Sequence, residues 1–81
     1  MAESISWEPF RETISRHLGL EPGEITEMTD IYRDLGLDSL GVVSLGMKLY
    51  AVFRVKVPMS AVSEVYTLGD MFRILNTYAV I

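Results

Sequence analysis

The chain contains no cysteine among its 81 residues, and this absence excludes two kinds of chemistry. Without thiols there is no disulfide framework and no cysteine nucleophile, so a stable fold must depend on the packing of apolar side chains. The chain also lacks an apolar run long enough for a membrane helix, and its first residues lack the basic and apolar segments of a signal peptide. We therefore expect a cytoplasmic protein that does not attach to a membrane.

Basic residues are scarce, with 7 Lys and Arg against 11 Asp and Glu, and the net charge is -4. This balance argues against binding to nucleic acid or to an anionic membrane surface, because both depend on basic patches. The charge is uneven: residues 1–38 carry a net -6, whereas residues 39–81 carry +2. A chain of this length supports one modest core, so we expect one domain over residues 1–81, acting as a monomer.

Apolar residues recur at helical spacing in the first and last parts of the chain, whereas strand patterns are weak throughout. The first helix is predicted to be capped by Ser6, to tolerate Pro9 in its first turn and to end at Gly19. Its apolar stripe consists of Trp7, Phe10, Ile14 and Leu18. The last helix is predicted to begin at a capping box of Thr67 and Asp70. Its stripe consists of Leu68, Met71, Phe72, Leu75 and Ala79.

The middle of the chain predicts a long connection and two more helices. Residues 21–37 show no sustained period, which predicts a long ordered loop of the kind that is usually functional in a small domain. A second helix is expected from Asp38 or Ser39 to about Phe53, and a short third helix after Ser60. The predicted fold class is all-α, an irregular four-helix bundle with a long loop between the first two helices.

The second predicted helix has two apolar faces. One face falls within about 100° of arc, faces the core in our prediction and consists of Val42, Leu45, Gly46, Leu49 and Phe53. The nearly opposite face contains Leu40, Val43 and Met47, with Ser44, Lys48 and Ala51 beside them. A small bundle cannot bury both faces, so the second one is predicted to be a contact surface, and its methionine suits adaptable contacts. The alternative is that a neighbouring loop covers it.

Residues 34–40 read Asp-Leu-Gly-Leu-Asp-Ser-Leu, directly ahead of this helix. Glycine, aspartate and serine are ordinary capping residues, so the Asp-Ser pair alone is not specific. The longer pattern, with a helix ending at Phe53 and then Val57-Pro58, resembles the acyl carrier protein family, whose attachment site is an Asp-Ser-Leu at the start of the second helix. The resemblance covers about residues 5–76 and includes Leu18-Gly19-Leu20, Glu24-Ile25 and Thr67-Leu68-Gly69-Asp70.

This resemblance implies a carrier rather than an enzyme. It implies a 4'-phosphopantetheine arm that a phosphopantetheinyl transferase moves from coenzyme A to Ser39, with Asp38 positioning the serine and acyl groups held as thioesters. A serine at the first helical residue also suits a phosphodiester, because that end of the helix dipole is positive. The other implied partners are the acyl-transferring and chain-extending enzymes of fatty-acid, polyketide or related biosynthesis.

In this family the acyl chain can lie between the second helix and the bundle, along Val42, Leu45, Gly46 and Leu49. Gly46 is unusual there because a glycine inside a helix costs about 1 kcal/mol relative to alanine. Two explanations stay open from the sequence. Gly46 provides space for a bulky or branched acyl group, or it permits close packing of helices.

One feature departs from the family's pattern. Carriers of primary fatty-acid synthesis usually present several acidic residues on the outward face of this helix, whereas this chain has Gly41, Ser44, Lys48, Tyr50, Ala51 and Val52. Electrostatic steering by that face is therefore expected to be weak. We predict partners matched to Leu40, Val43, Met47 and Lys48, in a specialised pathway such as polyketide, modified-lipid or aminoacyl carriage.

Other readings of these residues fit less well. A serine hydrolase needs a base, but the single histidine, His17, is expected to be a solvated helix-end residue. Ser39 also lacks the glycine two residues before it that a nucleophile elbow requires, and no strand precedes it. Asp30, Asp34 and Asp38 recur every four residues, but Gly36 and the missing glutamate spoil a calcium loop, so no metal is expected. The remaining alternatives are an aminoacyl or peptidyl carrier domain and an unmodified helical interaction domain.

Overall fold

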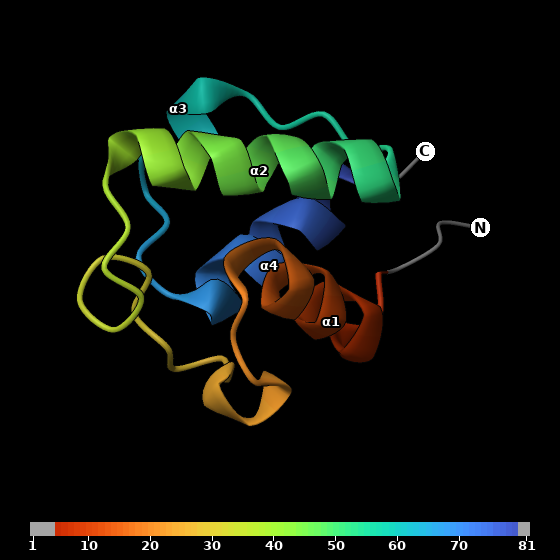
Figure 1. The fold of residues 1–81 in the computed structure, drawn as a ribbon. Coiled ribbons are helices and arrows are strands. Elements are labelled where there is room, and N and C mark those ends of the chain that lie inside the picture. Colours follow the sequence, from red (N-terminus) through yellow and green to blue (C-terminus); the bar gives the residue numbers. More distant parts are fainter. Residues whose placement is uncertain (1–4, 80–81) are drawn as a thin grey trace.

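Four α-helices and one 3₁₀ turn form the regular structure of residues 5–79, the part of the chain that the computed structural model describes. They are α1 (Trp7–Leu18), η1 (Pro22–Glu24), α2 (Ser39–Phe53), α3 (Met59–Val62) and α4 (Leu68–Tyr78). In Figure 1, α2 crosses in front of α4 and above α1, and the long connection between α1 and α2 closes one end of the bundle. The predicted all-α class is confirmed.

The core forms where the apolar stripes of α1, α2 and α4 meet. The inward face predicted for α2 is confirmed, since Val42, Leu45, Gly46 and Leu49 are buried and Phe53 packs against the core. At one end of the core an aromatic cluster joins α1 to α4. The rings of Trp7, Phe10 and Phe72 lie with centroids 5.1–5.3 Å apart.

The start of α1 differs in detail from the prediction. Ser6 occupies the capping position, but its side chain makes no capping hydrogen bond. Such a bond goes to the N–H of the second or third helical residue. The third is Pro9, which has no N–H, so only the N–H of Glu8 is left to the Ser6 side chain. Gly19 ends the helix as predicted, in the left-handed conformation with φ 71°, and its N–H donates to the Ser15 carbonyl at 2.8 Å.

The connection before α2 is ordered by its own hydrogen bonds. It contains η1, which the sequence did not predict because a three-residue turn is too short to produce a period. The Asp30 carboxylate accepts the N–H groups of Tyr32 and Arg33 at 2.9 and 2.7 Å, and Asp34 accepts that of Asp30 at 2.8 Å. These carboxylates therefore hold the backbone turn.

Three backbone bonds fasten this connection to the start of α4. The N–H of Ile31 donates to the Tyr66 carbonyl at 2.8 Å, and the N–H of Leu68 donates to the Thr29 carbonyl at 3.0 Å. The N–H of Gly69 donates to the Glu27 carbonyl, also at 3.0 Å. The chain just ahead of α2 is thus anchored to an element more than thirty residues away in sequence.

The short helix α3 begins at Met59, ahead of the predicted start after Ser60. Pro58 supplies the extended residue that precedes it. The helix before it, α2, ends at Phe53 as predicted, and Arg54 then takes a left-handed conformation with φ 56°.

Among residues 5–79, no helix combines the length and the apolar character that a bilayer span requires.

Candidate functional site

The Asp38-Ser39 pair forms the start of α2. Asp38 caps the helix from an extended backbone conformation, and its Oδ1 accepts the N–H of Gly41 at 2.8 Å. Ser39 is the first helical residue, and its side chain is exposed. The Ser39 hydroxyl is therefore presented to solvent at the positive end of the helix dipole.

Two backbone donors next to this hydroxyl are free. The first four N–H groups of a helix have no partner within the helix. Asp38 accepts that of Gly41 through its side chain and that of Val42 through its carbonyl, at 2.9 Å. The N–H groups of Ser39 and Leu40 have no acceptor within residues 5–79. An anionic group on the hydroxyl would meet both donors.

Comparisons with known proteins agree with this arrangement. Residues 8–75 match the protein family described as "Phosphopantetheine attachment site". A curated acyl carrier protein from Wolinella succinogenes is 32% identical over 71 residues, which cover 88% of this chain and 93% of that protein. The chain belongs to the acyl carrier protein family. Its cofactor is 4'-phosphopantetheine, and the predicted family and cofactor are confirmed.

The carrier exposes an apolar strip on α2, next to the candidate site. Leu40 is 78% exposed, Met47 is 63% exposed and Val43 is 36% exposed, and we call these three residues the outer strip. The alternative in which a loop covers this strip is wrong for residues 5–79. Ser44 and Lys48 are also exposed, and α2 has no acidic residue from Ser39 to Phe53.

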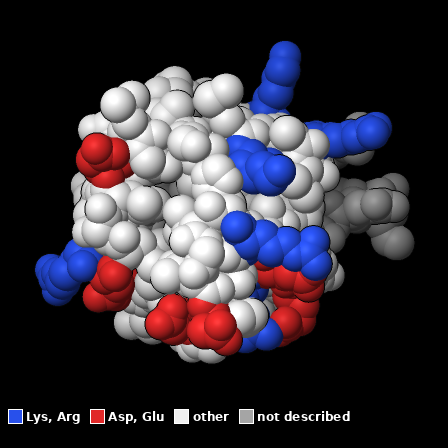
Figure 2. Space-filling view, in the orientation of Figure 1, with Lys and Arg blue, Asp and Glu red and all other residues white. Residues whose placement is uncertain are grey.

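Charges divide the visible face of the molecule. Figure 2 shows most of the acidic side chains along the lower edge, over α1 and the connection that follows it. The upper part over α2 is mostly uncharged, with basic groups toward one end and one acidic group at the other. This distribution follows the sequence, in which residues 1–38 contain nine acidic residues and residues 39–81 contain two. The carrier therefore presents α2 as a nearly neutral to basic surface.

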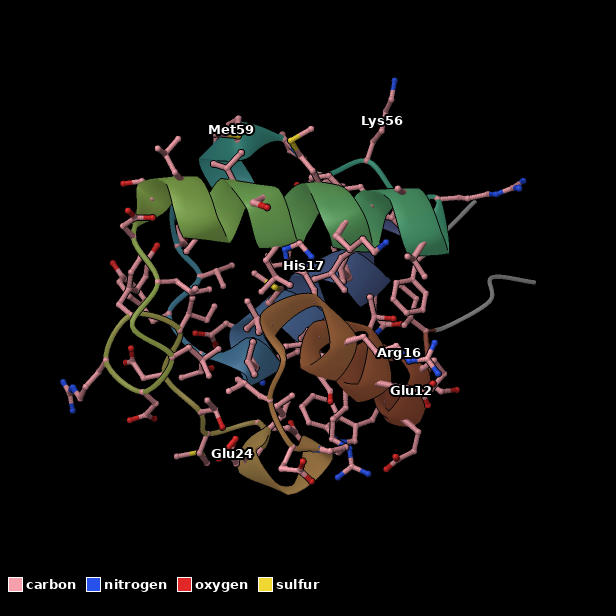
Figure 3. All side chains as sticks on the ribbon, in the orientation of Figure 1. Glu12, Arg16, His17, Glu24, Lys56 and Met59 are labelled. Atoms are coloured by element: carbon pink, nitrogen blue, oxygen red, sulfur yellow. The ribbon has the colours of Figure 1, made fainter. Side chains whose placement is uncertain are left out.

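His17 joins α1 to α2. It is exposed in the last turn of α1, as predicted, and Figure 3 shows it between the two helices. Its Nε2 lies 3.3 Å from the Ser44 hydroxyl, so its hydrogen-bonding neighbour is Ser44 rather than Ser39. No local sequence pattern predicts this contact, because the two residues are 27 positions apart.

A small apolar cavity lies beneath α2, between it and the segment from Val57 to Leu75. It is lined by Gly46, Leu49, Tyr50, Val57, Val62, Val65, Met71, Ile74 and Leu75. Of the four residues predicted along an acyl path, Gly46 and Leu49 line this cavity. Val42 and Leu45 are buried in the core and do not line it.

Tyr50 does not lie on the outward face of α2, where the sequence predicts it. It is half-buried and lines the cavity. A Cβ at Gly46 would lie 3.5 Å from the Tyr50 hydroxyl and 3.6 Å from its ring carbon Cζ. Residues four apart share one side of a helix, so the ring lies over the glycine. Burial raises the pKa of the Tyr50 hydroxyl.

Proposed function

We propose that Ser39 bears the 4'-phosphopantetheine arm and that the carrier holds acyl intermediates as thioesters on it. The observation that supports this most directly is the exposed Ser39 hydroxyl, which stands at the first residue of α2 beside two free backbone N–H groups. When bound, the group supplies a thiol on a flexible arm, which a chain without cysteine lacks.

In this proposal Asp38 positions the serine. Its hydrogen bond to the Gly41 N–H fixes the first turn of α2 and hence the direction of the Ser39 hydroxyl. The N–H groups of Ser39 and Leu40 then face the phosphodiester oxygens, and a negative charge at this end of a helix is favoured by about 0.3–1 kcal/mol. The chain itself binds and presents the arm, and we propose no catalytic residue.

We propose that the acyl chain follows the inner side of α2, past Val42, Leu45, Gly46 and Leu49. Gly46 and Leu49 line the cavity and are its candidate contacts. Gly46 provides space there that the Tyr50 ring occupies in the described structure. Val42 and Leu45 support this wall from the core.

We propose that the outer strip and Lys48 bind the partner enzymes. These are a phosphopantetheinyl transferase and the acyl-transferring and chain-extending enzymes of one pathway. The exposed apolar side chains of the outer strip, and the lack of acidic residues on α2, support a specialised fatty-acid, polyketide or related pathway rather than primary fatty-acid synthesis. In this role the chain acts as one monomeric carrier domain.

Intact mass spectrometry tests the attachment. The chain is incubated with coenzyme A and a promiscuous phosphopantetheinyl transferase, beside Ser39→Ala and the control Ser44→Ala, which removes another exposed serine of α2. We expect the native chain and Ser44→Ala to gain one phosphopantetheine and Ser39→Ala to gain none. If the mass of the native chain did not increase, an unmodified interaction domain would be supported instead. If the mass of Ser39→Ala increased, the arm would be attached to another residue.

A further inference from the structure

Ser39, Gly46 and Tyr50 lie along one side of α2. At 100° per residue, positions 39, 46 and 50 fall within about 40° of arc. At a rise of 1.5 Å per residue, Gly46 is about 10 Å and Tyr50 about 16 Å from Ser39 along the helix axis. An arm attached to Ser39 that follows this side of the helix therefore arrives at the cavity beside Gly46 and Tyr50.

This cavity is closed in the described structure. Its free volume is about 10 Å³, which is close to the minimum for one water molecule. Leu49, Val65, Met71 and Leu75 form its buried floor, and Tyr50, Val57, Val62 and Ile74 are half-buried at its rim. An acyl chain can enter only if one of the rim side chains moves.

Tyr50 is the rim side chain best able to move. Val57, Val62 and Ile74 are β-branched, which restricts rotation about χ1. The Tyr50 hydroxyl makes no hydrogen bond within residues 5–79, so rotation of the ring breaks none there. Its ring lies over Gly46, which has no side chain to pack against it.

Tyr50 also supplies the one polar side-chain atom among the residues that line the cavity. A tyrosine hydroxyl is protonated at neutral pH, because its ordinary pKa is about 10, and burial raises the pKa of Tyr50 further. It can therefore donate a hydrogen bond. A saturated acyl chain has no hydrogen-bond acceptor along its length, whereas the oxygen of a hydroxyl or keto group on the chain can accept a bond from the Tyr50 hydroxyl.

We propose that Tyr50 is the gate of the acyl cavity and that its hydroxyl selects acyl groups with a hydroxyl or keto oxygen over saturated ones. This inference rests on the proposed attachment of the acyl arm to Ser39. The ring rotates away from Gly46 when a chain enters, and the hydroxyl then donates to the oxygen of the chain. Tyr50 is thus a specificity residue in contact with the carried group.

Hydrolysis rates of the loaded thioester test the gate. Octanoyl and 3-hydroxyoctanoyl groups are loaded on the native chain, Tyr50→Phe and Tyr50→Ala, with Tyr66→Phe and Tyr66→Ala as controls at an exposed tyrosine. On the native chain and the controls, we expect the 3-hydroxyoctanoyl thioester to hydrolyse roughly three- to tenfold more slowly than the octanoyl one, as one net hydrogen bond allows. Tyr50→Phe removes this difference. Tyr50→Ala slows octanoyl hydrolysis several-fold, because the cavity stands open.

Two outcomes would overturn the gate. One is equal hydrolysis rates for native, Tyr50→Phe and Tyr50→Ala chains with both acyl groups. The other is faster octanoyl hydrolysis in Tyr50→Ala, since the ring would then shield the chain rather than exclude it. Intact mass confirms loading before each assay, so a chain that fails to load counts against the proposed function and not against the gate.

A second attachment route tests the gate without the transferase. Ser39→Cys creates the single thiol of the chain, which is coupled to maleimides that carry alkyl chains of increasing length. We expect the NMR signal of the Met71 methyl group, at the cavity floor, to shift with chain length more strongly in Ser39→Cys/Tyr50→Ala than in Ser39→Cys. Equal shifts in the two proteins would contradict the gate.

Discussion

At the scale of single residues, Gly69 makes the sharpest prediction about stability. A Cβ there would lie 2.8 Å from the Glu27 carbonyl oxygen and 3.1 Å from the Glu27 Cβ. Backbone atoms cannot move aside as a flexible side chain does, and the Gly69 N–H already bonds to that carbonyl at 3.0 Å. We expect Gly69→Ala to lower the free energy of unfolding by about 1–3 kcal/mol, measured by urea denaturation.

Gly23→Ala is the matched control for Gly69→Ala. A Cβ at Gly23 meets no atom within 4 Å. If both variants changed the free energy of unfolding equally, the close approach of α4 to Glu27 would not matter for stability.

Single residues also mark where sequence reasoning succeeded and where it failed. The Asp38 cap was predicted because capping depends on the residues within one turn, and the same holds for Thr67 with Asp70. Ser6 occupies the capping position without the side-chain bond, because such a bond also depends on the N–H groups that follow and Pro9 has none. Tyr50 was misplaced because its position beside Gly46 puts it at the edge between the two faces of the helix.

At the scale of one element, the capping box of α4 predicts a dependence of stability on pH. Asp70 Oδ2 accepts the N–H of Thr67 at 3.1 Å and that of Tyr66 at 3.1 Å. The pKa of Asp70 lies below its ordinary value, mainly because its carboxylate accepts the N–H of Thr67. Burial acts in the opposite direction, and the positive charge of Arg73 lowers the pKa further. A carboxyl group with a lowered pKa in the folded state stabilises that state above its ordinary pKa and loses the effect as pH falls through the lowered value.

Asp70→Asn tests this dependence by urea denaturation at several pH values. The native chain is expected to lose more stability than Asp70→Asn below about pH 4, the ordinary range of this carboxyl, and to be the more stable of the two at pH 7. Glu64→Gln, at an exposed position, serves as the control and should follow the native chain. Parallel pH profiles for the native chain and Asp70→Asn would contradict the assigned role of the cap.

The elements themselves were predictable where the apolar period is long. The limits of α2 and the start of α4 follow from local patterns, whereas η1 is too short to show one. The bridge between Asp30 and Thr67 and the contact between His17 and Ser44 join distant parts of the chain. Such contacts depend on how the helices pack, which no single segment encodes.

At the scale of the whole molecule, the charge distribution predicts weak attraction to a basic docking surface. We expect a fatty-acid ketosynthase with such a surface to bind the carrier weakly, with little change as salt concentration rises. Lys48→Glu should strengthen that binding by roughly two- to fivefold at low salt, a range typical of one exposed ion pair. Isothermal titration at two salt concentrations measures both effects.

Lys56→Glu is the control for this titration. It makes the same change of charge after the end of α2, where Figure 3 shows the Lys56 side chain pointing away from the helix. Tight, salt-sensitive binding of the native chain to the ketosynthase would contradict a specialised partner.

The aromatic cluster at the junction of α1 and α4 provides an optical probe. Trp7 is the single tryptophan of the chain, and its ring packs edge-on against Phe72 with centroids 5.3 Å apart. Its emission wavelength therefore reports whether the two helices are docked, in a region that neither the arm nor the outer strip occupies. Excitation at the long-wavelength edge of tryptophan absorption avoids the tyrosines, so the unfolding experiments above can be followed by fluorescence without a label.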